Sequence, residues 1–393
     1  MLCDLPSDTG INTDLLNSIP ADTKIFWDYG RRSSAHKRRL DARDPKADAG
    51  QDAPRSQLGL LKRIEKSLPP SWIPDPEFLP LGEHSLDIPH ALRAARKIIK
   101  NHPIEAIVVN ADPYAAMLVG AKLARETGLP LVQDLRDPWA LCSLRRPRRR
   151  SLQRAIVDRL ERWSFEAASA IVLNTETALR DYVDHYVDMP SDRFSVIRNH
   201  GDRDLIGNGH YPRSAQFTML FFGNFRRFVE GHSLIDALGE LKKRGIDGDQ
   251  AQLLISGECP QDVKDRAEKL GVIGMLKSHP FVPYLEAGSF MAASDLLISL
   301  SNDTKQRIPA KFFDYATTER PILVVGDTPE LIEMTAALPG AYQRGRLDSR
   351  GIADAMEIAI RGGPQQCIAR PDTGLDSQSA SKKLASILDR VAH

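Results

Sequence analysis

The sequence predicts an α/β protein made of two consecutive units, each with a parallel sheet covered by helices. Short apolar runs alternate with helix-like segments along most of the 393 residues. The runs are continuous rather than alternating, which is typical of strands buried on both faces of a parallel sheet. A stretch rich in glycine and turn-forming residues, 201–215, interrupts this pattern and predicts a linker between the two units.

The predicted strands alternate with predicted helices in both units. In order along the chain, the apolar runs lie at residues 24–27, 104–109, 129–133, 170–173, 217–222, 252–256, 296–300 and 321–325. Proline marks several helix starts, because its fixed φ suits the first helical position and its missing N–H costs nothing there. Such starts lie at Pro113, Pro309 and Pro329.

The remaining segments complete the domain plan. Residues 30–57 contain one leucine and no Phe, Trp or Tyr, which predicts a mobile insertion. We therefore expect a first domain over 1–200, the linker over 201–215 and a second domain over 216–363. A C-terminal tail that ends in a helix is expected over 364–393.

Composition excludes several classes of protein. The chain has 53 Lys and Arg against 52 Asp and Glu, so a globally basic nucleic-acid binder and an acidic-tail protein are excluded. The four cysteines are scattered without a CxxC pair, which fits a reducing compartment. The start of the chain lacks a signal-peptide pattern, and no apolar run approaches the ~18–20 residues that span a bilayer. We expect a cytoplasmic protein, at most peripheral at the inner face of a membrane.

Two loops of the second unit carry residues suited to a phosphate-bearing ligand. In Phe222–Gly231, a glycine permits close backbone approach, and Arg226 or Arg227 can form bidentate hydrogen bonds to phosphate oxygens. The helix predicted from Pro309 offers free N–H groups to a phosphate, Lys311 adds a positive charge, and Asp314 suits sugar hydroxyls. The alternatives are an ordinary turn with solvated arginines and a surface helix with a weak Lys–Asp pair.

Two segments of the first unit are also unusually polar. Residues 133–139 place two carboxylates, an arginine and a tryptophan directly after a buried strand; the alternative is a salt-bridged loop with Trp139 packed over the core. Arg145–Arg150 holds five arginines in six residues, a positive patch that suits anionic lipid headgroups, a pyrophosphate-linked acceptor or RNA. Its alternative is a solvated helix start.

Metal-binding patterns are weak. Asp202 and Asp204 match the short Asp-x-Asp signature of metal-dependent sugar transferases, but they fall in the predicted linker and we interpret them as linker residues. The ten histidines show no paired spacing, so no metal site is expected.

Together these loops resemble the GT-B glycosyltransferases of family four, which are retaining and use nucleotide sugars. The resemblance runs from about Trp72 to about Met334. The stretches that carry it are Asn110–Gly120, Leu129–Trp139, Leu160–Asn174, Val196–Asp202, Phe222–Asn224, Ile255–Glu258, His279–Pro283, Ala293–Leu296 and Ile308–Ala316. It implies two Rossmann-like domains that face each other across a cleft.

The resemblance also implies a role for individual residues. Around the donor diphosphate it places Gly223, Asn224, Gly257, Lys311 and, as the nearest cations, Arg226 or Arg227. The backbone of Phe281 and Val282 would meet the base, and Asp314 the ribose. Arg136 and Asp137 match the catalytic loop that faces the reacting sugar and the acceptor. No cofactor and no metal are implied, because cationic side chains stabilise the leaving diphosphate.

The chain departs from the family pattern at several positions. Asp314 stands where glutamate is usual, Gln306 replaces the first member of the acidic pair, and Glu230 takes the place of a phosphate-binding lysine. His200 stands where glycine is usual. The residues from Thr13 already resemble a segment that normally follows the first strand, glycine loop and helix, so we expect an incomplete first domain.

The resemblance implies transfer of a hexose-type sugar from a nucleotide diphosphate to a glycan or lipid-linked acceptor. Membrane contact would involve Arg145–Arg150. The main alternative is a non-catalytic partner subunit. It is based on the incomplete first domain and on Glu230 and Gln306, which depart from the family pattern. A nucleotide-sugar epimerase would need strand-end carboxylates that are not evident. RNA binding would need an aromatic platform that the arginine patch lacks, so no nucleic-acid partner is expected.

Overall fold

The computed structural model describes most of the chain from residue 87 onward. The described residues are 20, 22–26, 87–111, 113–143, 146–148, 151–202, 204, 211–223, 225, 230–301, 304–371 and 373–392. The insertion expected at 30–57 lies outside them. So do Trp27, the end of the first expected strand, and most of the linker expected at 201–215.

The chain divides into two compact units. The first comprises residues 1–172, 186–195 and 388–393. The second comprises residues 173–185 and 196–387. The second unit therefore includes a helix that precedes the expected linker in the sequence.

The first unit contains a sheet whose order, among the described residues, is β1-β2-β3-β4. Its elements are α4 (Ile88–Asn101), β1 (Ile107–Asn110), α5 (Ala115–Thr127), β2 (Leu131–Leu135), η4 (Arg146–Arg148), α6 (Ser151–Glu166), β3 (Ala170–Leu173), η5 (Ser191–Arg193) and β4 (Phe194–Val196). The helix predicted to open at Pro113 begins at Ala115. The strands β2 and β3 are buried along their whole length, as continuous apolar runs predict.

The second unit contains a six-stranded sheet and several helices. Its elements are α7 (Glu176–His185), β5 (Phe217–Phe222), α8 (Glu230–Lys243), β6 (Ala251–Ser256), α9 (Gln261–Lys269), η8 (Ile273–Met275), β7 (Leu276–His279), α10 (Tyr284–Ala293), β8 (Leu296–Leu300), α11 (Ala310–Ala316), β9 (Ile322–Val325), α12 (Pro329–Ala336), β10 (Ala341–Arg344), α13 (Ser349–Arg361) and the larger part of α14 (Ser377–Ala392), whose last residues belong to the first unit. The starts predicted from Pro309 and Pro329 are confirmed by α11 and α12.

The sheet of the second unit reverses its winding at β5. Its order is β10-β9-β8-β5-β6-β7, and every pairing is parallel. The strand β5 pairs with β6 on one side and with β8 on the other, so the chain winds outward in both directions from β5. Ligands of open α/β sheets bind beyond the carboxyl ends of the strands at such a reversal.

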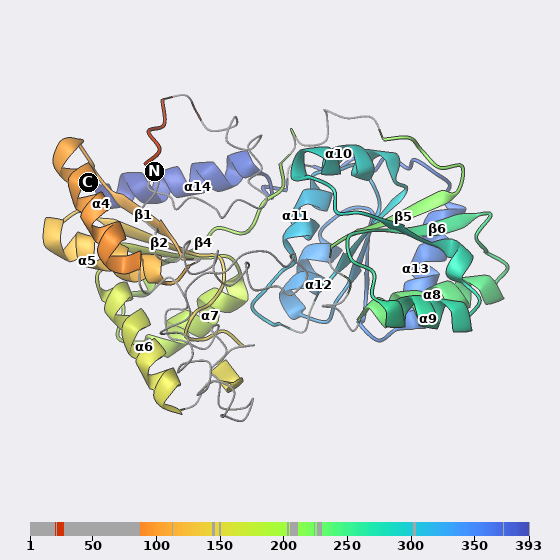
Figure 1. Cartoon of the computed structure of the whole chain (residues 1–393), viewed down its shortest axis with the longest axis horizontal. Helices are drawn as coiled ribbons and strands as arrows, with labels where there is room; N and C mark the ends of the chain where they lie inside the picture. Colours follow the sequence, from red (N-terminus) through yellow and green to blue (C-terminus); the bar gives the residue numbers. More distant parts are fainter. Residues whose placement is uncertain are drawn as a thin grey trace, which may run out of the picture. The chain divides into compact units, whose positions relative to one another are not determined.

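Two apolar cores cover the faces of this sheet. One joins alternate side chains of β5 and β6 to α8, α9 and α13. The other joins the intervening side chains to α10, α11 and α12. Figure 1 shows these two groups of helices on opposite faces of the sheet. A sheet buried on both faces explains why its central strands are continuous apolar runs.

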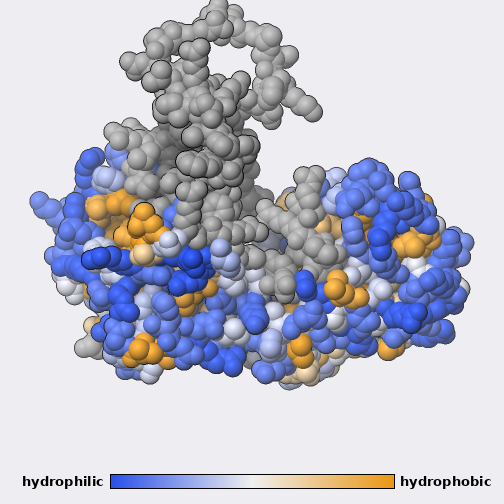
Figure 2. Space-filling model, turned by 90° about the horizontal axis from the view of Figure 1, so that it is seen from below, coloured by the Kyte–Doolittle hydropathy of each residue, from blue (hydrophilic) through white to orange (hydrophobic). Residues whose placement is uncertain are grey.

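The surface carries apolar residues in small groups. On the face drawn in Figure 2, they form separate patches among hydrophilic residues. Scattered apolar residues are normal on protein surfaces, so they mark an interface only together with a second feature such as charge. No helix of the described residues has the length and apolar character needed to cross a bilayer.

The buried carboxylate of Glu330 joins three segments of the second unit. Glu330 lies in the first turn of α12 and is 4% exposed. Its oxygens accept hydrogen bonds from the N–H groups of Glu176 and Thr177 at the start of α7, each at 2.9 Å. Arg198 donates to it at 3.0 Å. Burial raises the pKa of Glu330, but these hydrogen bonds outweigh burial and hold the pKa below its usual value.

We expect Glu330→Gln to lower the free energy of unfolding by about 2 kcal/mol, because an amide keeps one acceptor oxygen and turns an NH2 group toward N–H donors. Urea unfolding followed by circular dichroism measures the change. Glu333→Gln is the matched control, since Glu333 is exposed one turn away on the same helix. Equal unfolding midpoints for the two variants would contradict the anchoring role of Glu330.

Candidate functional site

Two glycine loops meet where the sheet of the second unit reverses. Gly223 follows β5 and Gly257 follows β6, with φ angles of 141° and 139° that side chains rarely adopt. A Cβ atom on Gly257 would lie 2.2 Å from the carbonyl oxygen of Gly223. The backbones therefore touch, and glycine is required for both the conformation and the contact. The result is a strand-end surface made of exposed backbone, which a ligand can approach closely.

Lys311 lies beside the first of these loops. Its Nζ is 5.7 Å from the centre of the Phe222 ring, and its Cε is 3.7 Å from the position of a Cβ built on Gly223. Burial lowers the pKa of the Lys311 ammonium, and the neighbouring Asp314 opposes that shift. A cation with little water around it gains more from an anionic ligand than an exposed one does. Lys311 therefore suits a phosphate held over Gly223.

Asp314 lies one turn further along α11. Burial raises its pKa to about 6, Lys311 lowers it, and the charge of Asp202 raises it. The pKa of the Tyr284 hydroxyl is raised to about 12, mainly by burial and further by the charges of Asp314 and Asp202. Asp202, Tyr284, Lys311 and Asp314 thus form one electrostatic group. The sequence alone did not indicate Tyr284, and it assigned Asp202 to a linker.

Glycine at position 201 explains how Asp202 reaches this group. A Cβ atom on Gly201 would lie 2.4 Å from the carbonyl oxygen of Phe313 in α11. Backbone hydrogen bonds join Gly201 to Leu375 and Ser377, at 2.9 and 3.0 Å. The segment that ends at Asp202 is therefore held against α11. The signal in the sequence was the Gly-Asp pair of the family-like stretch 196–202, rather than the Asp-x-Asp pattern.

The loop after β7 lies beside the second glycine loop. The N–H of Gly257 donates to the carbonyl of His279 at 3.0 Å. Val282 is buried in the apolar core, whereas the Phe281 side chain is 73% exposed. Val282 therefore anchors the loop, and the Phe281 ring is available to a flat ligand. Asn224, Arg226 and Arg227, which the resemblance places near the diphosphate, lie outside the described residues.

Gln306 holds α7 in this unit. It is 5% exposed, and its Nε2 donates to a carboxylate oxygen of Asp181 at 2.6 Å. The backbone carbonyl oxygen of Gln306 accepts a hydrogen bond from the Thr175 hydroxyl at 3.2 Å. An amide donor at this position satisfies a carboxylate on the neighbouring helix, which an acidic side chain could not do.

Arg136 and Asp137 lie in the first unit, directly after β2. Arg136 forms a close ion pair with Asp134, with its Nη2 2.7 Å from a carboxylate oxygen. Trp139 is 1% exposed, and its ring stacks on Tyr114 at 5.2 Å with an interplanar angle of 7°. The hydroxyl of Tyr114 donates to the Pro138 carbonyl at 3.0 Å. The loop is therefore fixed by packing and an ion pair, with Arg136 and Asp137 partly exposed.

Within the second unit, the described residues that the resemblance assigns to the donor site come together. Gly223, Gly257, Lys311 and Asp314 gather at the strand ends of the second unit, beside the loop of Phe281 and Val282. No three His, Cys, Asp or Glu side chains of the described residues group as metal ligands.

The raised pKa of Asp314 predicts a pH-dependent stability. The pKa of this carboxyl is 3.8 in the unfolded chain and about 6 in the folded protein. Between these pH values the folded state therefore binds more protons than the unfolded state. Raising the pH from about 4 to about 7 should therefore destabilise the wild type relative to Asp314→Asn by about 1–3 kcal/mol. Urea unfolding at each pH, followed by circular dichroism, measures the difference.

Asp389→Asn provides the control for this titration, because Asp389 is exposed on α14. The change with pH should be larger for Asp314→Asn than for Asp389→Asn, each measured relative to the wild type. A constant difference between the wild type and Asp314→Asn would show that Asp314 titrates normally.

Comparisons with known proteins agree with this architecture. Residues 47–200 match the model of the family described as "Glycosyl transferase 4-like domain". No curated protein matches the chain.

Several solved structures share the fold. A UDP-forming α,α-trehalose-phosphate synthase from Burkholderia xenovorans is 12% identical with a TM-score of 0.55, over 79% of this chain and 80% of that chain. HepE from Anabaena, solved in complex with UDP-glucose, is 15% identical with a TM-score of 0.52, over 77% and 82%. Sucrose-phosphate synthase from Thermosynechococcus elongatus is 13% identical with a TM-score of 0.50, over 79% and 76%. Residues 47–200 are thus similar to a glycosyl transferase 4-like domain, and the chain shares the GT-B fold of these solved structures.

Proposed function

We propose that the chain transfers a hexose-type sugar from a nucleotide diphosphate to a glycan or lipid-linked acceptor, with retention of configuration and without a metal ion. The observation that carries the proposal is the partly buried Lys311 beside the Gly223 loop, where the sheet reverses. The complex of the Anabaena protein with UDP-glucose supports a nucleotide-sugar donor.

The diphosphate would lie over the glycine loops, next to Lys311. Charge builds up on the leaving diphosphate as the bond to the sugar breaks, so a fixed cation there stabilises the transition state more than the ground state. Asn224 and Arg226 or Arg227 would supply further donors from the same loop. A cation held by the protein serves the purpose for which other transferases use a metal.

The rest of the donor would extend from this point. Asp314 would accept hydrogen bonds from the ribose hydroxyls, and the backbone near Phe281 and Val282 would meet the base. Arg136 and Asp137 of the first unit would orient the reacting sugar and the acceptor. The ion pair between Arg136 and Asp134 favours a positioning role for Arg136, because its guanidinium is held in one orientation.

We expect Lys311→Met to weaken nucleotide diphosphate binding and turnover about ten- to hundredfold, because one charged contact to a phosphate is lost. Methionine fills the space of the lysine stem. Lys305→Met is the matched control, since Lys305 is exposed on the preceding turn. Calorimetric titration with UDP, GDP, ADP and dTDP, with and without EDTA, measures binding and identifies the base.

The outcomes of this titration test metal independence, the donor-site assignment and the alternative functions. Loss of binding with EDTA would overturn metal independence. Unchanged affinity in Lys311→Met would overturn the donor-site assignment. If no nucleotide binds the wild type, the partner-subunit function replaces the enzymatic one, and co-elution with a second transferase tests it. Turnover of a UDP-sugar without any acceptor would indicate an epimerase.

We further propose that the first unit contacts an anionic membrane through the start of α6. Leu152 is 71% exposed and Ile156 39% exposed, one turn apart on the helix. Arg154 is exposed beside them, so apolar and positive side chains occur together, as at a lipid surface. Arg146 instead pairs with Asp158 at 2.6 Å. Arg145, Arg149 and Arg150 lie outside the described residues.

The double substitution of Leu152 and Ile156 by serine should weaken binding to phosphatidylcholine vesicles that contain phosphatidylglycerol about tenfold, because two apolar side chains leave the lipid. Vesicle co-sedimentation measures the affinity. Val187→Ser is the control, since Val187 is 82% exposed elsewhere in the same unit. Equal binding to vesicles without phosphatidylglycerol would contradict the role of the arginines.

A further inference from the structure

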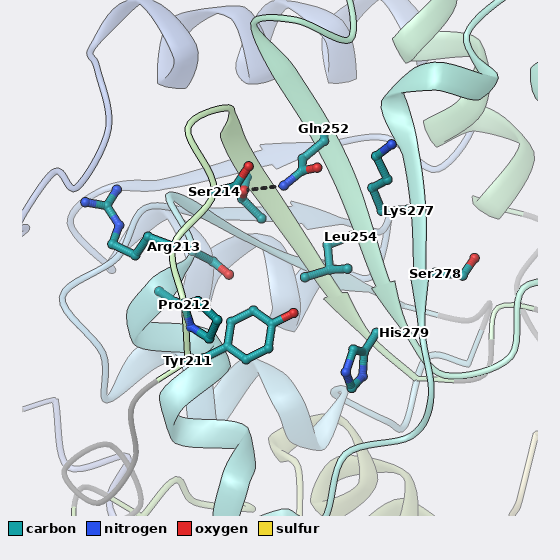
Figure 3. Close-up of a pocket in the computed structure, with 12 residues that line it drawn as sticks. Tyr211, Pro212, Arg213, Ser214, Gln252, Leu254, Lys277, Ser278 and His279 are labelled. Carbon is teal, nitrogen blue, oxygen red and sulfur yellow. Dashed lines mark hydrogen bonds between the residues drawn. The ribbon is translucent and has the colours of Figure 1, made fainter.

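A pocket of about 290 Å³ opens on one face of the six-stranded sheet, apart from the glycine loops. Its floor is formed by Thr218 of β5 with Gln252 and Leu254 of β6. The other lining residues come from β7 (Lys277, Ser278, His279), from the end of α10 (Ala293, Ser294) and from the segment before β5 (Tyr211, Pro212, Arg213, Ser214). Figure 3 shows these elements around the pocket.

The pocket is separated from the proposed donor site along the strands. Thr218 and Gln252 lie near the amino ends of β5 and β6, five residues before Gly223 and Gly257. At about 3.3 Å per residue, five residues of strand span about 16 Å. His279, at the carboxyl end of β7, lies between the two regions, since it lines the pocket and its backbone carbonyl accepts a hydrogen bond from Gly257.

Three polar groups on the pocket lack a partner among the described residues. Tyr211 stacks on Phe290 with ring centres 3.7 Å apart, and Figure 3 shows its hydroxyl directed into the pocket. Gln252 is 8% exposed, and its Nε2 donates a hydrogen bond to the Thr218 hydroxyl at 2.9 Å. Its side-chain carbonyl oxygen remains able to accept a hydrogen bond from a ligand. Lys277 contributes an exposed ammonium group at the rim. Polar groups in such positions are expected to bind water or a ligand.

The positive charge of Lys277 is not balanced by the residues around it. Arg213, the other cation on the pocket, forms an ion pair with buried Asp295 at 3.1 Å. Figure 3 shows the Arg213 side chain directed away from the pocket. No Asp or Glu lines the pocket. The pocket therefore favours an anionic group near Lys277.

Size and chemistry together define the ligand class. Pockets for drug-sized ligands occupy about 300–1,000 Å³, so this one suits a molecule smaller than a nucleotide sugar. The Gln252 carbonyl accepts from hydroxyls, and the Tyr211 hydroxyl both donates and accepts. We propose that this pocket binds a monosaccharide that carries an anionic group, with the anion at Lys277 and the sugar hydroxyls at Gln252 and Tyr211.

The experiment is a calorimetric titration of the full chain with glucose 6-phosphate, glucuronate and glucose. We expect one of the two anionic sugars to bind saturably and glucose to bind at least tenfold more weakly. Which of the two binds distinguishes a phosphate from a carboxylate. Lys277→Gln and Tyr211→Phe should each weaken that binding about five- to tenfold. Tyr211→Phe keeps the stacked ring, so it tests the hydroxyl without removing the packing.

Two controls separate this site from the donor site. Lys269→Gln, which removes an exposed lysine on α9, should leave binding unchanged. Lys311→Met should also leave it unchanged, and UDP should not compete with the anionic sugar. The proposal is overturned if neither anionic sugar binds the wild type, if glucose binds equally well, or if UDP displaces the ligand. Equal affinity in the wild type, Lys277→Gln and Tyr211→Phe would overturn it as well.

Discussion

The pairing of β5 with both β6 and β8 is the constraint on which the second unit depends. Because β5 starts the sheet and the chain then winds outward in both directions, the loops after β5 and β8 leave the sheet on opposite faces. Gly223 follows one of these strands, and the segment after the other leads to Lys311. Backbone and cation therefore meet at one point of the sheet edge, which no other pair of neighbouring strands in this sheet provides.

Burial of charge at that point has a free-energy cost that the rest of the unit must offset. Burial lowers the pKa of Lys311 and raises the pKa of Asp314, so it disfavours the charged form of both. The charge of each residue partly opposes the shift of the other. Such groups persist because the surrounding packing fixes them, here through α11 between the apolar core and the segment of Gly201. Glu330 shows the opposite case, since its hydrogen bonds outweigh burial and stabilise the ionised form.

The sequence predicted the central strands well and, apart from β1, missed the strands at the ends of the two sheets. The apolar runs at 217–222, 252–256, 296–300 and 321–325 are confirmed by β5, β6, β8 and β9, all covered on both faces. The strands β4, β7 and β10 were not predicted, and each lies at the end of its sheet. An edge strand has one neighbour and partly faces solvent, so β7 keeps Lys277 and Ser278 and shows no apolar run.

The sequence by itself determined the α/β class, the family resemblance, and Gly223, Lys311 and Asp314 as candidates, because backbone freedom and charge are properties of single residues in a local pattern. It did not determine which distant residues join them. Asp202 is a neighbour of Asp314 because Gly201 is held against α11, and Tyr284 because α10 and α11 pack into the same apolar core. The pocket beside β7 likewise exists only because strand pairing places Gln252 next to Thr218. Such contacts depend on strand register and helix packing, which join residues far apart in the chain and leave no local signal.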